Sequence, residues 1–333
     1  MAPRFGVIGV GALGYHHVRL LRDVAGDAFA GFHERDPVRA ATVAADLKVR
    51  AFDSIPALLD ACDAVSIVTA TLAHHAVAME AIAVGKHVFI EKPITVTLAE
   101  ADELLALATI KGVLVQVGHV ERFNRAIRAA WPHIKGPRFI ESDRLAPFTS
   151  RGADVAVVLD LMIHDIDLIL ALLESPVTSL DAVGVNVLTK TADIANARIN
   201  FASGAVANIT ASRVSGERTR TLRLFQPSGY LSLDLAAGSG TFFRLREGLD
   251  FAELAKGKGP LAMDAFVEKI PLEAPEGEPL KLELDAFIRA VQGTGPVLVP
   301  GAEGRQALDV ALRVMSAIEH GHPSLTGSAG GSA

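Results

Sequence analysis

Residues 4–17 read RFGVIGVGALGYHH, and this stretch decides the fold of the first part of the chain. Its opening apolar run is typical of a buried strand, and residues 12–25 have the pattern of a helix, so the glycines form the turn between them. Gly9 permits a tight turn, Gly11 lets the backbone approach a pyrophosphate, and Gly14 lets the helix pack closely on the strand. The motif therefore predicts a dinucleotide site, with the phosphates at the helix N-terminus.

An acidic residue supports that prediction. Glu34 stands twenty residues after Gly14, at the end of a second apolar run over 29–32. A carboxylate there accepts hydrogen bonds from the adenosine ribose and repels a 2′-phosphate, which predicts NAD as the cofactor. The neighbouring Arg35 can hold a 2′-phosphate, so NADP is not excluded. The residues predicted to bind the cofactor at this turn are Gly9, Gly11, Ala12, Leu13, Gly14, Glu34 and Arg35.

Composition narrows the class of protein. The 333 residues are half apolar, which is enough for two packed domains. The net charge of −6, with both signs interspersed, argues against nucleic-acid binding. The single cysteine, Cys62, cannot form an internal disulfide and is expected to be a small buried side chain, which fits a cytoplasmic location. No signal peptide is visible, and the longest uncharged apolar stretch, 64–79, divides into strand, turn and helix, so no membrane span is expected.

Residues 1–120 alternate short β-branched runs with alanine-rich helical segments. This alternation is typical of a parallel, doubly wound sheet, and it predicts an α/β Rossmann dinucleotide-binding domain. Pro37 is expected in the first turn of its helix, and Thr97 with Glu100 predicts a capping box. Strands are expected at 4–8, 29–32, 65–69, 87–90 and 113–117, and helices at 12–25, 37–47, 74–84 and 98–110.

From residue 121 one strongly apolar helix, 155–173, is followed by successive strands with glycine-containing turns. This pattern predicts an α+β domain over 121–322, an open and mostly antiparallel sheet packed on helices, which serves the substrate and oligomerisation. A flexible tail is expected at 323–333 and an irregular loop at 252–279. Strands are expected near 138–143, 177–188, 195–201, 205–212, 219–226, 230–235 and 241–247, and closing helices at 281–292 and 302–319.

Glu91-Lys92-Pro93 directly follows the apolar strand HVFI. The carboxyl ends of parallel strands border the ligand crevice, so Lys92 would project toward the position of a nicotinamide ring. A lysine there can hydrogen-bond a substrate oxygen, and Pro93 restricts its backbone to an extended conformation. A strand-end lysine is more often an ordinary surface residue, so this motif alone does not establish a function.

The predicted helix 155–173 carries Asp160 and His164 in an otherwise apolar sequence. Residues four apart share one helix face, and such a pair can raise the basicity of the imidazole and make it a general base. Alternatively, Asp160 is an acid favoured by the helix dipole and His164 a satisfied, half-buried histidine. Asp165 and Asp167 are expected to cap or brace neighbouring elements.

Taken together, these motifs and their order resemble the glucose–fructose oxidoreductase, inositol dehydrogenase and rhizopine catabolism (Gfo/Idh/MocA) family of NAD(P)-dependent oxidoreductases. The resemblance runs from Arg4 to about His320 and includes T-x-T-x-x-H at 69–74 and AIAVGKHVFIEKP at 81–93. Ala70 stands where the family often has proline, and Val155-Ala156 replaces a common glycine pair. Neither departure touches a reacting group.

The resemblance implies hydride transfer between a secondary alcohol and the nicotinamide, with Lys92, Asp160 and His164 as the catalytic set. His164 would take the hydroxyl proton, Asp160 would orient His164, and Lys92 would stabilise the developing oxyanion. In a lysine-led variant, His164 is only a substrate ligand. The further residues implied to border the cofactor are Thr69, Ala70, Thr71, His74, Glu91 and Lys92.

Segments 118–124, 157–170 and 211–234 look like the branch of the family that includes UDP-N-acetylglucosamine 3-dehydrogenases. A nucleotide sugar requires cations for its diphosphate, and arginines are frequent in these segments and near them. The alternatives are an inositol, polyol or free-sugar dehydrogenase and, in a different class, a non-catalytic dinucleotide sensor. The arginines are Arg122, Arg125, Arg151, Arg213, Arg218 and Arg220. The predicted substrate-binding residues are Lys92, Arg122, Asn124, Arg151, Asp160, His164 and Arg213.

The adjacent histidines bear on metal binding, and the predicted sheet bears on assembly. The pairs His16-His17 and His74-His75 are adjacent residues, which point to different helix faces, so no metal site is expected; His17 is expected to support the glycine turn.

Along 205–212, small and apolar residues alternate with polar ones, so one sheet face would take the helix and the other would face solvent or a second subunit. A homodimer or homotetramer joined through that face is expected.

Overall fold

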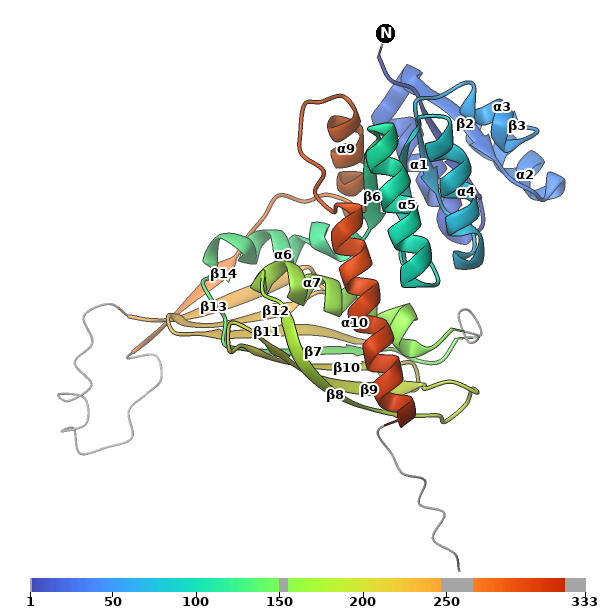
Figure 1. Ribbon diagram of the computed structural model, residues 1–333. Helices are drawn as coiled ribbons and strands as arrows, with labels where there is room; N and C mark the ends of the chain where they lie inside the picture. The colour runs from blue at the N-terminus through green and yellow to red at the C-terminus, as the bar shows by residue number, and fades with distance from the viewer. Residues whose placement is uncertain (1, 150–154, 247–265, 321–333) are drawn as a thin grey trace, which may run out of the picture. The chain divides into compact units, whose positions relative to one another are not determined.

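The structure is a computed structural model of the chain, and it describes residues 2–149, 155–246 and 266–320. These residues form two compact units (Figure 1). The first unit is Met1–Arg125 with Pro275–Asp309, and the second is Ala126–Ala274 with Val310–Ala333. The division predicted after residue 120 lies near the end of the first segment of this unit, to which the chain returns at Pro275.

The first unit is built on a six-stranded parallel sheet in the order β3-β2-β1-β4-β5-β6. This is the strand order of a dinucleotide-binding Rossmann fold, as predicted. The strands are β1 (Phe5–Ile8), β2 (Phe29–His33), β3 (Ala51–Phe52), β4 (Ala64–Ile67), β5 (His87–Glu91) and β6 (Val115–Gly118). The helices of this unit are α1 (Ala12–Ala25), α2 (Pro37–Leu47), α3 (Ile55–Leu59), α4 (Thr71–Ala83), α5 (Leu98–Lys111) and α9 (Pro279–Val291).

Local sequence signals explain where these helices begin. Asp36 accepts hydrogen bonds from the N–H groups of Val38 and Arg39, with Pro37 in the first turn of α2. Thr97 and Glu100 form the predicted capping box of α5.

Apolar packing explains the return of the chain to the first unit. Phe287 of α9 contacts Phe5 of β1 and Phe89 of β5 edge to face, with ring centroids 6.4 and 5.7 Å apart.

Cys62 is buried and donates to the Leu58 carbonyl at 3.1 Å, and burial raises the pKa of its thiol to about 12. This confirms that Cys62 is a small buried side chain.

The second unit contains an eight-stranded sheet in the order β14-β13-β12-β11-β7-β10-β9-β8, in which only β7 and β10 pair in parallel. The mostly antiparallel sheet is therefore confirmed. The strands are β7 (Phe139–Leu145), β8 (Val177–Val185), β9 (Ile194–Phe201), β10 (Val206–Ser212), β11 (Thr219–Gln226), β12 (Gly229–Asp234), β13 (Ser239–Leu245) and β14 (Val267–Leu272). The helices are α6 (Arg125–Ala130), α7 (Ile163–Leu173) and the part of α10 (Gly301–His320) that follows Asp309.

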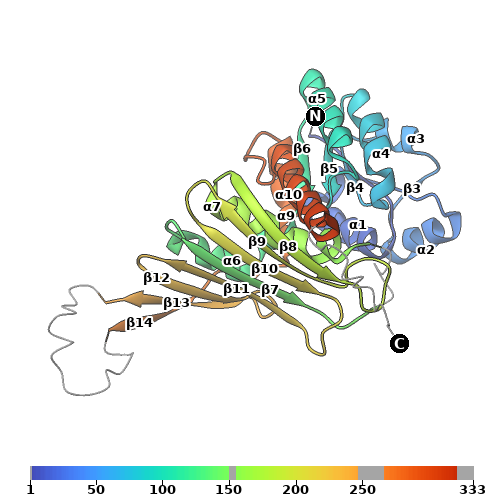
Figure 2. The same ribbon diagram turned by 60° about the horizontal axis from the view of Figure 1, so that its bottom comes forward.

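Helices α6 and α7 lie on one face of this sheet (Figures 1 and 2). The alternation predicted for 205–212 holds as far as residue 211: Ala207, Ile209 and Ala211 are buried, whereas Asn208 and Thr210 are half-buried. Ser212, predicted on the polar face, is buried as well. Within the described residues, no helix covers the other face (Figure 2). On strands β7, β11, β12 and β13 a row of aromatic rings lies at centroid distances of 4.5–5.7 Å, formed by Phe139, Phe225, Tyr230 and Phe243.

Two elements differ from the prediction. Strand β14 lies inside the expected loop 252–279, and its Pro271 is tolerated because the strand is at the sheet edge. The single helix expected at 155–173 is instead a π-helical turn, Val158–Met162, followed by α7. In the part of the chain that the structure describes, no helix is both long and apolar enough to cross a membrane. The predicted tail at 323–333 lies outside the described residues.

Candidate active site

The glycine turn joins β1 to α1 with the geometry that the motif requires. Gly9 has φ +89°, and a Cβ there would lie 2.9 Å from the Val68 carbonyl oxygen. A Cβ on Gly14 would lie 2.0 Å from the Gly9 carbonyl oxygen, so the helix approaches the turn as closely as it does only because residue 14 is glycine. A Cβ on Gly11 would meet no described atom within 4 Å.

Three observations show that this turn fits a dinucleotide. Space is left beside Gly11, where the backbone has to approach a pyrophosphate. Among the described residues, no side chain caps the N-terminus of α1, and its first turn contains no acid, so its N–H groups can meet phosphate oxygens. The hydroxyl of Thr69, whose methyl group would contact a Cβ on Gly9, is buried with no hydrogen-bond partner in the described part of the chain.

Alanine substitutions at Gly11 and Gly14 should distinguish the glycine that leaves space for the cofactor from the glycine that lets α1 pack on the turn. Gly14→Ala is expected to lower the free energy of unfolding by about 1–3 kcal/mol, because the new methyl group overlaps the Gly9 carbonyl. Gly11→Ala should leave the unfolding temperature nearly unchanged but weaken NAD binding at least about tenfold, equivalent to about 1.4 kcal/mol. Thermal unfolding and NADH fluorescence titration measure the two effects. Equal affinity of Gly11→Ala and the wild type for NADH would contradict the assignment of this space.

Glu34 and Arg39 lie beside the glycine turn. The half-buried Glu34 carboxylate accepts the N–H of Val10 at 2.7 Å and that of Asp36 at 3.1 Å. The Arg39 guanidinium donates to the carbonyls of Val10 at 2.8 Å and Gly11 at 3.3 Å. Arg39 is not among the residues predicted from the sequence, because an arginine in the first turn of a helix belongs to no motif. Arg35 is exposed, and no described contact involves its side chain.

The second group of predicted residues follows strands β4 and β5. Thr69 is half-buried, Ala70 is the exposed N-cap of α4 and Thr71 is its first residue. Lys92 is half-buried and comes directly after β5, and its peptide bond to Pro93 is cis. The motifs T-x-T-x-x-H and Glu-Lys-Pro thus follow adjacent strands, at the carboxyl edge where a parallel sheet binds its ligands.

Glu91 and the histidines of this edge face inward. The buried Glu91 carboxylate lies 3.0 Å from His17 Nε2 and accepts the Lys92 N–H at 3.2 Å. Burial alone would raise the pKa of Glu91, but the hydrogen bond and charge of His17 lower it below its usual range. His17, expected to support the glycine turn, instead contacts Ser66 and Glu91.

In the second unit, Asp160 lies in the π-helical turn and His164 is the second residue of α7. Both side chains are half-buried. Single π-helical turns are rare in proteins overall, and many of those that occur lie at functional sites. The next residue, Asp165, forms a buried bidentate ion pair with Arg144 of β7, at 2.7 and 3.0 Å. Asp165 therefore braces α7 against the sheet, as expected.

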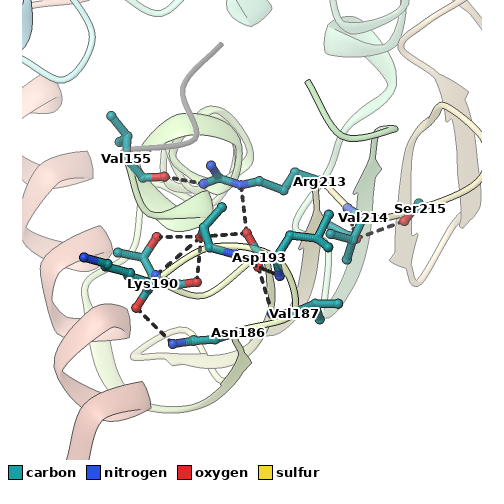
Figure 3. A network of polar contacts seen from close by, with 12 residues as sticks. Val155, Asn186, Val187, Lys190, Asp193, Arg213, Val214 and Ser215 are labelled. Atoms are coloured by element: carbon teal, nitrogen blue, oxygen red, sulfur yellow. Dashed lines mark hydrogen bonds and ion pairs between the residues drawn. The ribbon is translucent and has the colours of Figure 1, made fainter. Parts of the chain in front are cut away.

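Arg213 is engaged inside the second unit (Figure 3). Its guanidinium donates to the Val155 carbonyl, just before the π-helical turn, and lies 3.8 Å from the Asp193 carboxylate. The backbone N–H groups of Leu188 and Thr189 outweigh the effect of burial and lower the pKa of Asp193 to about 2. Arg213, predicted to bind substrate, thus contacts the loop before β9 and the start of the helix.

The remaining predicted substrate residues belong to the first unit or lie outside the description. Arg122 pairs with Glu303 of α10, and Asn124 is buried and donates to Glu121 at 3.0 Å. Arg151 lies outside the described residues. Arg122 and Arg213 are thus each engaged by other groups of their own unit.

Comparisons with known proteins agree with the resemblance in the sequence. Residues 3–119 match the family model described as an oxidoreductase family with an NAD-binding Rossmann fold, and residues 116–232 match the GFO/IDH/MocA C-terminal domain. A UDP-N-acetylglucosamine 3-dehydrogenase of Acidithiobacillus ferrooxidans is 38% identical over 317 residues, which are 95% of this chain and 97% of that protein.

A solved structure of that enzyme and one further relative show how far the similarity extends. A solved structure of the A. ferrooxidans UDP-N-acetylglucosamine 3-dehydrogenase has a TM-score of 0.86 at 37% identity, covering 96% of this chain and 98% of that chain. A scyllo-inositol 2-dehydrogenase (NAD(+)) of Bacillus subtilis is 32% identical over 232 residues, covering 64% of this chain and 68% of that protein. The chain therefore belongs to the GFO/IDH/MocA family of oxidoreductases, and its first unit is the NAD-binding Rossmann domain of that family.

Proposed function

We propose that this chain is an NAD-dependent dehydrogenase that oxidises the C3 hydroxyl of UDP-N-acetylglucosamine or a closely related UDP-sugar. The observation that carries the proposal is the extent of similarity to the A. ferrooxidans enzyme named for that reaction, which covers 95% of this chain at 38% identity. Similarity over that length includes the second unit, which follows the cofactor domain and carries Asp160 and His164.

The proposed reaction assigns one task to each of three residues. NAD⁺ held at the glycine turn would supply the acceptor for the hydride on the carbon that bears the hydroxyl group. His164 takes the hydroxyl proton, Asp160 orients His164, and the Lys92 ammonium stabilises the oxyanion that develops as the proton leaves. The balance is one secondary alcohol and NAD⁺ converted to one ketone, NADH and one proton. Thr69, Thr71 and the glycine turn bind the cofactor in this proposal.

Isotope transfer tests the carbon assigned to the reaction. UDP-N-acetylglucosamine carrying deuterium at C3 should transfer it to the nicotinamide and give deuterated NADH. The ketone product should have lost that deuterium and the hydrogen of the hydroxyl group. The same sugar with deuterium at C4 should give unlabelled NADH. Label transfer from C4 and not from C3 would overturn the regiochemistry while leaving a UDP-sugar dehydrogenase in place.

Glu34 supports NAD over NADP, and an isosteric substitution tests it. Glu34→Gln keeps an oxygen that can accept the Val10 N–H, but it removes the charge that repels a 2′-phosphate. The ratio of kcat/KM for NADP to that for NAD should rise about tenfold, equivalent to about 1.4 kcal/mol. Arg35→Ala serves as the control and should lower that ratio or leave it unchanged. Wild-type kcat/KM at least as high with NADP as with NAD would contradict the choice of NAD.

An inositol or polyol dehydrogenase is the second candidate. It is favoured by the 32% identity to the B. subtilis scyllo-inositol 2-dehydrogenase and by the internal contacts of Arg122 and Arg213, which leave fewer cations for a diphosphate. The similarity to that enzyme covers 64% of this chain, against 95% for the UDP-sugar enzyme, and this difference places the inositol reaction second.

We also propose that the sheet face without helices joins two or four copies of the chain. The aromatic row from Phe139 to Phe243 supports this, as do polar cross-strand pairs such as Arg198–Asn208, at 3.1 Å, and Asn196–Thr210, at 3.0 Å. A mixed apolar and polar face suits a subunit contact. Light scattering at micromolar concentration should give a multiple of the chain mass, and a single species of one chain mass would contradict the assembly.

A further inference from the structure

Two pairs of adjacent histidines each place one imidazole inside the first unit and the other nearer the surface. His17 is buried on α1 whereas His16 is exposed, and His74 is buried on α4 whereas His75 is half-buried and contacts Glu103 at 3.0 Å. The proposed function gives none of these four residues a chemical task. The two inner histidines approach the same short segment, residues 91–93, from different helices.

His17 reaches this segment through the residue before Lys92. Its Nε2 lies 3.0 Å from Glu91 Oε1, and Glu91 Oε2 accepts the backbone N–H of Lys92 at 3.2 Å. His17 Nδ1 lies 2.9 Å from the hydroxyl of Ser66 in β4. Each side chain in this chain of contacts is buried, so a hydrogen bond lost here is not replaced by water at no cost.

The ionised carboxylate of Glu91 determines which residue donates in its contact with His17. His17 favours the ionised form of Glu91, and an ionised carboxylate can only accept, so the proton between the two residues belongs to His17 Nε2. With one carboxylate oxygen held by His17, the other is directed at the Lys92 N–H.

His74 reaches the segment through the residue after Lys92. Its Nδ1 lies 2.9 Å from the Pro93 carbonyl oxygen, and its Nε2 lies 3.1 Å from the Thr69 carbonyl oxygen. The imidazole thus links the segment that follows β5 to the segment that follows β4, next to the glycine turn. Burial lowers the pKa of His74, although the two carbonyl groups oppose this shift.

We propose that His17 and His74 are positioning residues for Lys92. His17 holds the peptide before Lys92 through Glu91, and His74 holds the carbonyl after it and couples it to Thr69. The ammonium group is thereby delivered from a backbone that is held at the Lys92 N–H and at the Pro93 carbonyl one residue further on, which limits its displacement when substrate charge develops. This inference rests on the proposed catalytic role of Lys92.

Matched substitutions of each pair test the inference. His17→Ala and His74→Ala should each lower kcat about 10- to 100-fold, since a misplacement of about 1 Å can cost about 100-fold. The Kd for NADH should stay within about threefold of wild type if Lys92 placement, and not cofactor binding, is what is lost. His16→Ala and His75→Ala remove the neighbouring imidazoles and should leave kcat unchanged. Rates are expressed per NADH-binding site, so a partly unfolded preparation does not lower kcat.

Conservative variants distinguish positioning from structural support. Glu91→Gln retains an oxygen for the Lys92 N–H, and its amide can donate to His17 if the ring changes tautomer, so its kcat should exceed that of Glu91→Ala at least about tenfold. The His17→Ala/Glu91→Ala double variant should be no slower than Glu91→Ala alone, because both act through one contact. If His17→Ala does not fold, His17→Gln with the same readouts takes its place.

Each possible outcome supports or contradicts the inference. Wild-type kcat in His17→Ala and His74→Ala, while Lys92→Ala is inactive, would overturn the positioning role and leave the proposed function intact. An active Lys92→Ala would overturn the proposed function itself. Additive losses in the His17/Glu91 double variant, or losses confined to the unfolding temperature, would show that the histidines serve the fold and not Lys92.

Discussion

Replacing Lys92 with alanine should lower kcat about 100- to 10,000-fold, the range typical of a positioned group that acts on a proton or oxyanion in the transition state. The truncation removes only the half-buried side chain, and the contacts of Glu91 and His74 use the backbone around it. The Kd for NADH should therefore remain within about threefold of wild type. Stopped-flow single turnovers and fluorescence titration measure the two quantities.

Two further substitutions sharpen this test. Lys92→Arg keeps a positive charge but cannot lose its proton, so partial recovery of kcat would support oxyanion stabilisation and no recovery would support the lysine-led variant. Lys86→Ala, which removes the lysine just before β5, is the matched control and should leave kcat unchanged. Near-normal turnover of Lys92→Ala would contradict the assignment.

Replacing His164 with alanine should also lower kcat about 100- to 10,000-fold if it is the general base. The acid limb of the pH–rate profile should disappear with the imidazole, because a missing base has no protonated, inactive form. Asp160→Asn should cause a smaller loss, since it leaves the base in place but removes its charged partner. His133→Ala is the control, because that ring packs on Phe242 in the same unit with centroids 5.5 Å apart.

The size and type of loss at His164 separate the two mechanisms. If Lys92 leads and His164 only binds substrate, His164→Ala should raise KM and retain most of kcat, and the larger kcat loss should fall on Lys92→Ala. Retention of both kcat and the acid limb in His164→Ala would exclude it as the base.

Much of the first unit could be predicted because its signals are local. The G-x-G-x-x-G turn, the proline of α2 and the capping box at Thr97 each act within a few residues, and the helix α1 begins and ends at the predicted residues. The return of α9 to the first unit could not be predicted. It depends on the contacts of Phe287 with Phe5 and Phe89, which are far apart in the sequence.

The same distinction between local and distant signals applies to the second unit. A π-helical turn differs from an α-helix by one hydrogen-bond register, which the apolar spacing of 155–173 does not reveal. Strand β14 has charged residues and Pro271, so its pattern resembles a loop until its edge position is known.

The motifs in the sequence predicted which residues belong to the candidate site, but not which groups surround each of them. Lys92, Asp160 and His164 lie at chain positions with recognisable spacing. An arginine that binds a diphosphate and one that braces a loop are identical in sequence, and Arg213 contacts Val155 and Asp193. His17 and His74 were identified as members of adjacent pairs, yet their contacts with Glu91 and Pro93 required the sheet to bring β4 and β5 together.

The most direct test of the account is NADH formation, followed at 340 nm, when the enzyme and NAD⁺ are mixed with a panel of UDP-sugars and inositols. The account predicts the highest kcat/KM with UDP-N-acetylglucosamine or a close UDP-sugar, and a low value with every inositol. Turnover of inositols without turnover of UDP-sugars would contradict the substrate and favour the polyol enzyme. The absence of NADH formation with every compound, from protein that binds NADH, would contradict the dehydrogenase assignment and favour a dinucleotide sensor.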